Sequence, residues 1–427
     1  MNNAGRSQAA MSNSAQKDAT KDALRRRWAL FALFFVPGIS ISSWVTRTPD
    51  IRDLLGASTA EIGLVLLGLS VGSMVGILSS GPLVARFSTR LVMVVGTTLI
   101  VLSMPTIGVG ASLSEGGIVT AGLLLFGLGM GGVEVALNVE GADVEQALDK
   151  PVLPALHGSF SLGTFVGAVA GIVFTATEYP VLNHLLIISA IDLLLIISAI
   201  DLLILIVAIR QITPGVGKTE RAAGASGATP SGGLGVLVRD GRLLIIGAVV
   251  LAMALAEGTA NDWLPLVMVD GHGFDAALGS AIYAVFAASM TIGRFGGGWF
   301  IARYGRAAVL CASAIAGAAG LAVVIFVDNQ AAAGTAVVLW GLGASLGFPV
   351  ALSAAGAYGP KSAARVSFVA TLGYVAFLVG PPVLGFLGEH YGLRNALIVP
   401  LALVVAAAFL APQIVRRRGQ LHGSSAR

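Results

Sequence analysis

The chain has 427 residues, of which 56% are apolar and only 11% are charged, and its mean hydropathy is +0.87. Soluble domains carry about 25% charged residues, so this composition excludes a soluble globular protein and indicates an integral membrane protein. The net charge of +4 comes from basic residues that flank apolar segments and face anionic lipid, so we expect no nucleic-acid partner.

Residues 1–27 are polar and lack the apolar core of a signal peptide, so we expect a disordered cytoplasmic tail there. Twelve apolar segments follow, each long enough for the roughly 20 residues that cross a bilayer. They cover residues 28–46, 61–81, 91–111, 117–138, 157–177, 181–209, 243–263, 278–301, 306–327, 331–353, 366–388 and 393–414. We therefore expect an all-α membrane protein with two pseudo-symmetric six-helix bundles, 28–209 and 243–414, a Gly- and Ser-rich cytoplasmic linker at 210–242 and a cytoplasmic tail at 415–427.

The two halves share a motif that predicts an internal duplication. The octapeptide at 81–88, Gly-Pro-Leu-Val-Ala-Arg-Phe-Ser, returns at 298–305 as Gly-Trp-Phe-Ile-Ala-Arg-Tyr-Gly. Each copy closes the second apolar segment of its half. Trp44 and Trp263 likewise lie near the end of the first segment of each half. Agreement in order and spacing favours a duplicated unit of roughly 200 residues.

Lys and Arg residues predict the orientation of the chain. They gather before the first segment, after the second and eighth, and between the sixth and seventh, whereas the opposite side shows only Arg47, Arg52 and Arg394. Because cytoplasmic loops carry the excess of basic residues, we expect both termini and the linker to be cytoplasmic.

The sixth segment contains a nine-residue tandem repeat. Residues 185–192, Leu-Leu-Ile-Ile-Ser-Ala-Ile-Asp, return unchanged as residues 194–201. Nine residues rotate a helix by roughly 180°, so Asp192 and Asp201 should face opposite ways and cannot form one site. We expect neither aspartate to be needed for function.

Three motifs connect the chain with a known family: Trp-Val-Thr-Arg-Thr-Pro-Asp-Ile at 44–51, His-Gly-Ser-Phe-Ser-Leu-Gly at 157–163 and Glu-Gly-Thr-Ala-Asn-Asp-Trp at 257–263. With the twelve segments and the repeated basic turn, they resemble the major facilitator superfamily of secondary transporters, in a bacterial branch near the fucose permeases and the rhizopine-associated membrane proteins. The resemblance implies alternating-access transport in the inner membrane, without enzymatic activity or a cofactor.

The basic turn departs from the family pattern in both halves. Ala85 and Ala302 stand where that family usually carries an aspartate that helps to hold the cytoplasmic side shut. Arg86 and Arg303 remain, and the resemblance makes them gating candidates. The closing mechanism itself cannot be carried over without the carboxylate.

Ionisable side chains within the apolar segments are candidates for the site. Each costs about 2.5–3.5 kcal/mol near the bilayer centre on insertion scales, so each should face a cavity or the bundle interior. Glu134 and Asn138 lie four residues apart on the fourth segment and share a helix face. Glu257 and Asn261 share a face of the seventh in the same way.

In the family that the chain resembles, segments one, four, seven and ten line the central cavity. Hydroxylated solutes need hydrogen-bonding groups and an apolar face for stacking. We therefore predict solute contacts from Trp44, Asn138, Asn261, Asp262, Trp263, Phe348 and Tyr374.

Glu134 is the first candidate for proton coupling, because a buried carboxylate can load and release a proton as access alternates. A permanent ion pair with Arg294 of the eighth segment is the alternative. Glu257, the second coupling candidate, lies roughly 21 Å along its helix at 1.5 Å per residue. This position is too far toward the outside for Glu257 to pair easily with Arg294, so we do not expect that pair.

Four polar residues have expected roles in gating or in pairing at the outer mouth. Arg294 and His157 are gating candidates, and for His157 a structural hydrogen bond at the start of the fifth segment is an equal alternative. Arg47 and Asp50 are expected to pair at the outer mouth.

The sequence therefore predicts a monomeric, proton-coupled symporter in the lipid bilayer that moves a sugar, a cyclitol or an amino-sugar derivative such as a rhizopine. Efflux of a drug-like or hydrophobic metabolite and a non-transporting sensor are the alternatives. The five histidines show no metal-ligand spacing and no nucleophile motif appears, which argues against an enzyme and a metal site.

Overall fold

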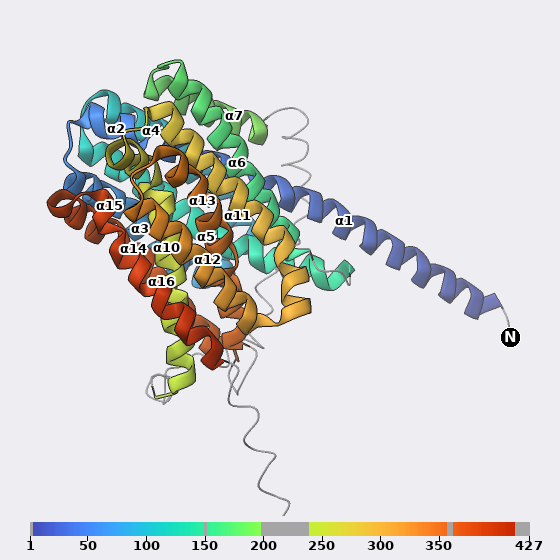
Figure 1. Cartoon of the computed structure of the whole chain (residues 1–427). Helices are drawn as coiled ribbons and strands as arrows, with labels where there is room; N and C mark the ends of the chain where they lie inside the picture. Colours follow the sequence, from blue (N-terminus) through green and yellow to red (C-terminus); the bar gives the residue numbers. More distant parts are fainter. Residues whose placement is uncertain (1–2, 149–151, 198–238, 357–361, 415–427) are drawn as a thin grey trace, which may run out of the picture.

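The computed structural model describes residues 3–148, 152–197, 239–356 and 362–414, and within these ranges the chain is helical (Figure 1). The first half contains α1 (Asn3–Val45), α2 (Thr48–Leu55), α3 (Thr59–Phe87), α4 (Thr89–Ser112), α5 (Gly116–Leu148), α6 (Leu153–Ala176) and α7 (Val181–Ile197). The second half contains α10 (Gly241–His272), α11 (Ala276–Tyr304), α12 (Arg306–Phe326), α13 (Gln330–Gly356), α14 (Ser362–Tyr391), α15 (Leu393–Ala396), α16 (Ile398–Leu410) and the one-turn helix η2 (Ala411–Ile414).

The membrane-spanning character expected from the sequence is confirmed. Among the described residues, eleven helical stretches are long and apolar enough to cross a membrane. The sixth expected segment is α7, which is apolar over Val181–Asp192 but shorter. The end of that segment, nearly all of the expected linker at 210–242 and the tail at 415–427 lie outside the described residues.

The N-terminal segment differs from its expectation. Residues 3–27, for which we expected a disordered tail, are helical and continuous with the first span; the N-terminal part of this helix projects from the bundle (Figure 1), whereas Ala23 and Arg26 are buried. Residues 6–27 contain neither glycine nor proline and are rich in alanine, lysine and arginine, which are strong helix formers. Extending an existing helix also avoids the cost of nucleating a new one.

The internal duplication is visible in how the helices pack. In the first half, α5 packs against α3 and α4, and α1 packs against α6. The same pairs recur in the second half, where α13 packs against α11 and α12, and α10 packs against α14. The two halves meet mainly through α6 with α11 and α3 with α14, so the interface is pseudo-symmetric as well.

The repeated basic turn adopts the same backbone conformation in both copies. Ser88 separates α3 from α4 with φ 93° and ψ 157°, and Gly305 separates α11 from α12 with φ 80° and ψ 161°. This region suits glycine, and other residues in it cost about 1–3 kcal/mol. The first copy therefore stores backbone strain that the second avoids.

Glycines bring helices into backbone contact within each half. A methyl group at Gly72 of α3 would lie 2.2 Å from the Leu124 carbonyl oxygen of α5, and one at Gly163 of α6 would lie 2.3 Å from the Phe35 carbonyl oxygen of α1. Small residues allow such close approach of membrane helices. Close glycine contact also occurs between the halves, because a methyl group at Gly63 of α3 would lie 3.0 Å from the Cα atom of Gly385 of α14.

Candidate functional site

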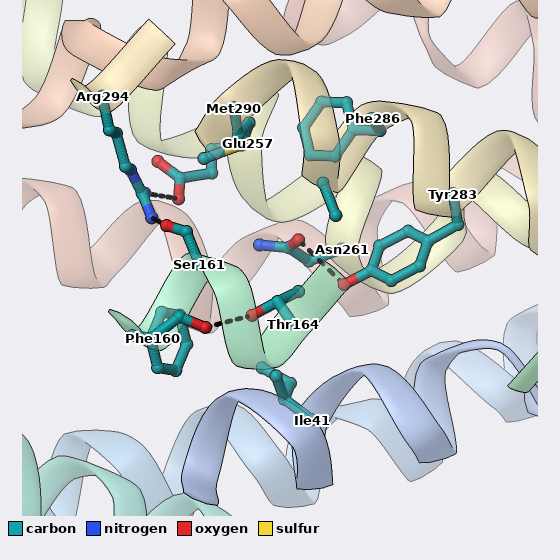
Figure 2. Close-up of a pocket in the computed structure, with 11 residues that line it drawn as sticks. Ile41, Phe160, Ser161, Thr164, Glu257, Asn261, Tyr283, Phe286, Met290 and Arg294 are labelled. Carbon is teal, nitrogen blue, oxygen red and sulfur yellow. Dashed lines mark hydrogen bonds and ion pairs between the residues drawn. The ribbon is translucent and has the colours of Figure 1, made fainter. Parts of the chain in front are cut away.

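A pocket lies between the two halves and combines polar and apolar side chains (Figure 2). Its cavity volume is about 40 Å³, well below the roughly 300–1,000 Å³ of small-molecule sites, so its own side chains nearly fill the pocket in this conformation. One wall comes from α1 and α6 and the other from α10 and α11. The lining residues are Ile41, Phe160, Ser161, Thr164, Glu257, Asn261, Tyr283, Phe286, Ala287, Met290 and Arg294.

Arg294 is the polar centre of this pocket and connects the two halves. Its Nη2 atom donates to Oε1 of Glu257 at 2.8 Å, and its Nη1 atom donates to Oγ of Ser161 at 3.1 Å (Figure 2). Ser161 belongs to the first half, whereas Arg294 and Glu257 belong to the second. The Glu257 side chain is only 13% exposed, so the pair is shielded from bulk solvent and membrane surface alike.

This pairing corrects the expectation that Glu257 lies too far outward to reach Arg294. Counting residues along each helix ignored the length of the arginine side chain, which spans more than one helical turn of 5.4 Å. It also corrects the alternative of a permanent Glu134–Arg294 pair, because the guanidinium is bound to Glu257 in this conformation.

Glu134 is nevertheless part of the same electrostatic cluster. From α5 in the first half, it is attracted by Arg294 and repelled by Glu257. Among the described residues, no hydrogen-bond partner is found for its carboxylate. The cluster thus has one guanidinium and two carboxylates: Glu257 lines the pocket and is paired with Arg294, whereas Glu134 lies outside the lining.

The rest of the pocket offers hydrogen-bonding groups beside apolar surfaces. The Tyr283 hydroxyl lies 3.5 Å from Oδ1 of Asn261, which is a long contact and leaves the amide open to other partners. Thr164 donates to the carbonyl oxygen of Phe160 within its own helix. Aromatic rings from Phe160 and Phe286 face the space that remains (Figure 2).

Three predicted solute-binding residues and one gating candidate lie outside the pocket lining. Oδ1 of Asn138 on α5 accepts a hydrogen bond from Nε2 of His157 at 3.0 Å, which joins α5 to α6. The charge of Glu134 acts on the Tyr374 hydroxyl, and the centroid of the Tyr374 ring lies 6.4 Å from that of Phe348. In this conformation none of these four side chains lines the pocket.

The remaining predicted solute contacts are buried elsewhere. Trp44 and Trp263 are each 1% exposed and belong to the hydrophobic core of the bundle, so neither ring faces the pocket. Asp262 is also buried and lies outside the lining, although its charge acts on Tyr283. The rotation of about 100° per residue separates Asp262 and Trp263 from the pocket face of α10 that carries Asn261.

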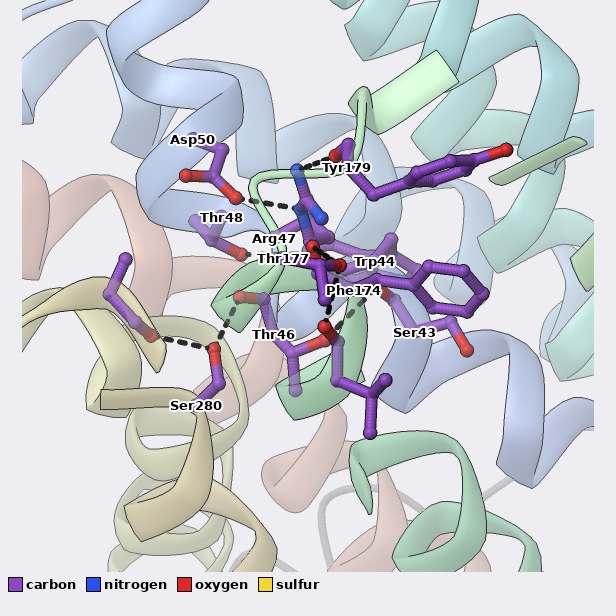
Figure 3. Close-up of polar contacts among 12 residues, drawn as sticks. Ser43, Trp44, Thr46, Arg47, Thr48, Asp50, Phe174, Thr177, Tyr179 and Ser280 are labelled. Atoms are coloured by element: carbon purple, nitrogen blue, oxygen red, sulfur yellow. Dashed lines mark hydrogen bonds and ion pairs between the residues drawn. The ribbon is translucent and has the colours of Figure 1, made fainter. Parts of the chain in front are cut away.

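The halves are bound together at the end of the bundle that carries α2, which we call the α2 end. The Ser280 hydroxyl of α11 donates to the Thr46 carbonyl oxygen at 2.9 Å (Figure 3). Arg52 of α2 forms an ion pair with Asp270 of α10, and Glu389 of α14 accepts a hydrogen bond from the amide of Ala60. The expected pair of Arg47 with Asp50 is present there too, at 2.6 Å.

The opposite end of the bundle carries the Ser88 and Gly305 turns, and its two gating candidates make no such contacts between the halves among the described residues. Arg86 and Arg303 are exposed, and within the described part of the chain neither forms an ion pair. Arg86 lies over the ring of its neighbour Phe87 instead. A gating role for these two arginines stays a prediction, since neither contacts a carboxylate of the described residues in this conformation.

The pocket contains residues that the sequence did not single out. Phe160, Ser161 and Thr164 come from α6, and Met290 comes from α11, whereas the predicted solute contacts came from the first, fourth, seventh, tenth and eleventh spans. A signal was present in the motif at 157–163, which places two serines and an aromatic residue in an apolar segment. That motif was used only for the family resemblance.

Comparison with known proteins decides the family. A sequence model of the Major Facilitator Superfamily matches residues 3–144 and 155–374. The chain belongs to the major facilitator superfamily. As a member of this superfamily it is a multi-pass membrane protein and a secondary transporter, and not an enzyme.

Sequence similarity between this major facilitator protein and its relatives extends over nearly the whole length of both chains. It is 30% identical over 401 residues to an uncharacterized MFS-type transporter of Yersinia pestis, covering 93% of this chain and 98% of the relative. Membrane protein MosC of Rhizobium meliloti is 25% identical over 383 residues, which are 88% of this chain and 87% of MosC.

Solved structures confirm the fold. The nucleoside transporter NupG matches with a TM-score of 0.66 at 16% identity, covering 92% of this chain and 99% of NupG. The transporter FucP, crystallised in the outward conformation, matches with a TM-score of 0.65 at 19% identity and the same coverage. The expected family and the two-bundle helical fold are therefore confirmed.

Proposed function

We propose that this transporter moves a small hydroxylated solute, such as a sugar, a cyclitol or an amino-sugar derivative, by alternating access coupled to protons. The observation that carries the proposal is the pocket between the halves, in which Arg294 is bound by Glu257 and Ser161, while Glu134 of the same electrostatic cluster has no hydrogen-bond partner within the described ranges.

Proton coupling follows from the charges of this cluster. One guanidinium and two ionised carboxylates carry a net charge of −1, which is unfavourable in a protein interior. Uptake of one proton by Glu134 neutralises the cluster without breaking the Arg294–Glu257 pair. The neutral cluster can then be enclosed as the halves close around it, and the proton leaves when the pocket opens on the other side.

The lining favours a hydroxylated ring over a purely apolar solute. Asn261 and Tyr283 provide donors and acceptors that are not saturated by each other at 3.5 Å. Phe160 and Phe286 provide flat apolar faces, on which the C–H face of a sugar or cyclitol can stack. A drug-like hydrophobic solute would leave the Arg294–Glu257 pair without matched polar partners.

We also propose that both termini are cytoplasmic, in an inner membrane, because the basic residues gather on their side of the bundle. The α2 end is then the outer end. Contacts from Ser280, Arg52 and Glu389 hold it together, so this conformation is closed to the outside.

Proteoliposome transport tests the proposal. Uptake of labelled sugars and cyclitols is measured with and without an imposed pH gradient for the wild type, for Glu134→Gln and for the control Glu115→Gln, which changes an exposed carboxylate near the α2 end. We expect gradient-driven uptake of at least one solute, lost in Glu134→Gln but retained in the control. Solute exchange at equal pH should survive in Glu134→Gln, because the pocket lining is unchanged.

Two results would overturn the proposal. If folded wild-type protein moves no member of the panel in either direction, a hydroxylated solute is wrong, and efflux of another metabolite or a sensor role replaces it. If uptake occurs but is equally gradient-dependent in Glu134→Gln, the solute class stands and the coupling residue is wrong.

A further inference from the structure

A second group of buried polar side chains lies between α1 and α7, apart from the central pocket. His184, Ile188 and Asp192 recur every four residues along α7 and are all buried, so they share its inner face. The facing side of α1 carries Ser40, and Arg47 follows the end of this helix; both residues are also buried. The two helices run in opposite directions, so Asp192 meets Ser40 while His184 lies toward Arg47.

Asp192 has an unusual environment for a carboxylate. It is 0% exposed, its Oδ2 atom lies 2.6 Å from Oγ of Ser40, and its Oδ1 atom has no hydrogen-bond partner among the described residues. The Ser40 hydroxyl lies 3.2 Å from the Val36 carbonyl oxygen as well. A hydroxyl has one proton, so when it is given to Val36, only a protonated Asp192 can complete the bond to Ser40.

Within the described part of the chain, no cation lies close enough in sequence on these elements to compensate a charge on Asp192. Arg47, which follows α1, and His184 of α7 are each about two helical turns away along the chain, and α1 carries no other titratable group between Arg27 and its end at Val45. The titratable groups of α4 and α6 are Arg90 and His157, each near the end of its helix opposite to α2. An ionised carboxylate without a cation or full hydrogen bonding is strongly disfavoured in such an interior.

His184 and Arg47 extend this polar face toward the α2 end. The His184 ring stacks on Phe174 with 4.3 Å between centroids, and neither ring nitrogen has a hydrogen-bond partner within the described ranges. Arg47 donates Nη2 to the Tyr179 carbonyl oxygen at 2.7 Å, whereas its buried Nη1 has no such partner there (Figure 3). Buried polar atoms of this kind are normally satisfied by ordered water.

We propose that the face between α1 and α7 is a hydrated proton-binding site, with Asp192 as the group that takes the proton. Loading transfers one proton from a hydronium ion to the carboxylate and leaves a water molecule and a neutral carboxylic acid. Waters beside His184 and Arg47 connect Asp192 with the α2 end, where Asp50 is partly exposed. Ser40 precedes Ile41, a residue of the central pocket, so the Asp192–Ser40 bond positions that stretch of α1.

This assignment differs from the expectation that neither aspartate of the tandem repeat is needed. Asp192 belongs to the first copy and is fully enclosed, whereas Asp201 lies outside the described residues. The two copies therefore offer a matched comparison, because Asp192→Asn and Asp201→Asn make the same change in the same local sequence.

Infrared difference spectroscopy of the purified full-length protein tests the site without any transport measurement. At neutral pH the wild type should show a carboxylic-acid C=O band that is lost in Asp192→Asn and retained in Asp201→Asn. Transfer to D₂O should shift the band, because water reaches the acid. His184→Phe keeps the ring stacking but removes the ring nitrogens, and it should slow the D₂O shift.

The outcomes separate the parts of the proposal. An unchanged band in Asp192→Asn would show that Asp192 is not the protonated group. A band that does not respond to D₂O would refute the hydrated path. If Asp192→Asn fails to fold, Ser40→Ala replaces it: the band should shift in frequency when the hydrogen bond is lost, and an unshifted band overturns the assignment.

Discussion

Replacing Arg294 by glutamine should destabilise the protein, because two carboxylates, Glu257 and Glu134, share this one cation. In the wild type, Nη2 of Arg294 lies 2.8 Å from Glu257, whose side chain is 13% exposed, and the same guanidinium attracts Glu134. Removing one partner of a buried ion pair costs about 3–5 kcal/mol. The Arg294 side chain is 22% exposed, so we expect the lower end, about 3 kcal/mol at neutral pH.

The matched variant Glu257→Gln should be milder. The amide oxygen can still accept a hydrogen bond from Arg294, Ser161 still accepts another, and Glu134 remains as a counter-charge. The loss is then that of one charged hydrogen bond, about 1.5–3 kcal/mol. The stability of Arg294→Gln should recover as the pH falls, since protonation removes the unpaired negative charges.

Thermal unfolding in detergent, followed by tryptophan fluorescence, measures these differences. The decisive comparison adds Glu134→Gln to the wild type and to Arg294→Gln. It should be nearly neutral or mildly destabilising in the first background and stabilising in the second, because there it removes an uncompensated charge. Equal effects of Glu134→Gln in both backgrounds would refute the shared cluster, and with it the electrostatic basis for proton coupling.

Three further predictions concern other parts of the molecule. Arg52→Asp should repel Asp270 and weaken the contacts at the α2 end by about 0.5–1 kcal/mol, which is a two- to fivefold shift toward protein that is open at this end. Thiol labelling of a cysteine introduced in the pocket should then become faster, and adding Asp270→Arg should restore the wild-type labelling rate. Ser88→Gly should raise the free energy of unfolding by about 1–3 kcal/mol, because glycine adopts the positive φ of this turn without strain and already occupies the same turn in the second half. An unchanged midpoint of thermal unfolding would show that the turn is unstrained. Partial burial opposes ionisation of Asp240, but hydrogen bonds from Arg365 and two backbone amides outweigh it and lower its pKa. This stabilisation is present at neutral pH and lost as the solution is acidified below the normal aspartate pKa, so the wild type should lose more stability there than Arg365→Gln.

Much of the architecture is determined by the sequence alone. The twelve apolar segments, the family and the duplication could all be predicted, because a bilayer requires about 20 apolar residues per helix and leaves little alternative to helices. The octapeptides at 81–88 and 298–305 even form turns of the same backbone conformation. The pairing of Arg47 with Asp50 was local in sequence and was also predicted.

The site itself was only partly predictable. Glu257, Asn261 and Arg294 were chosen correctly as polar residues of the interior, and all three line the pocket. Trp44 and Trp263 were chosen because aromatic rings suit sugars, yet both rings are enclosed in the core. Helical periodicity gives the angle between residues on one helix, but it does not say which face the bundle turns toward the pocket.

What only the tertiary structure decided is the set of contacts between residues far apart in the chain. Arg294 binds Glu257 rather than Glu134, and Ser40 meets Asp192 across 152 residues. These choices depend on side-chain reach and on how neighbouring helices are rotated and offset. Burial and hydropathy determine that a helix crosses the membrane, whereas the packing of one helix on another determines which of its polar groups meet.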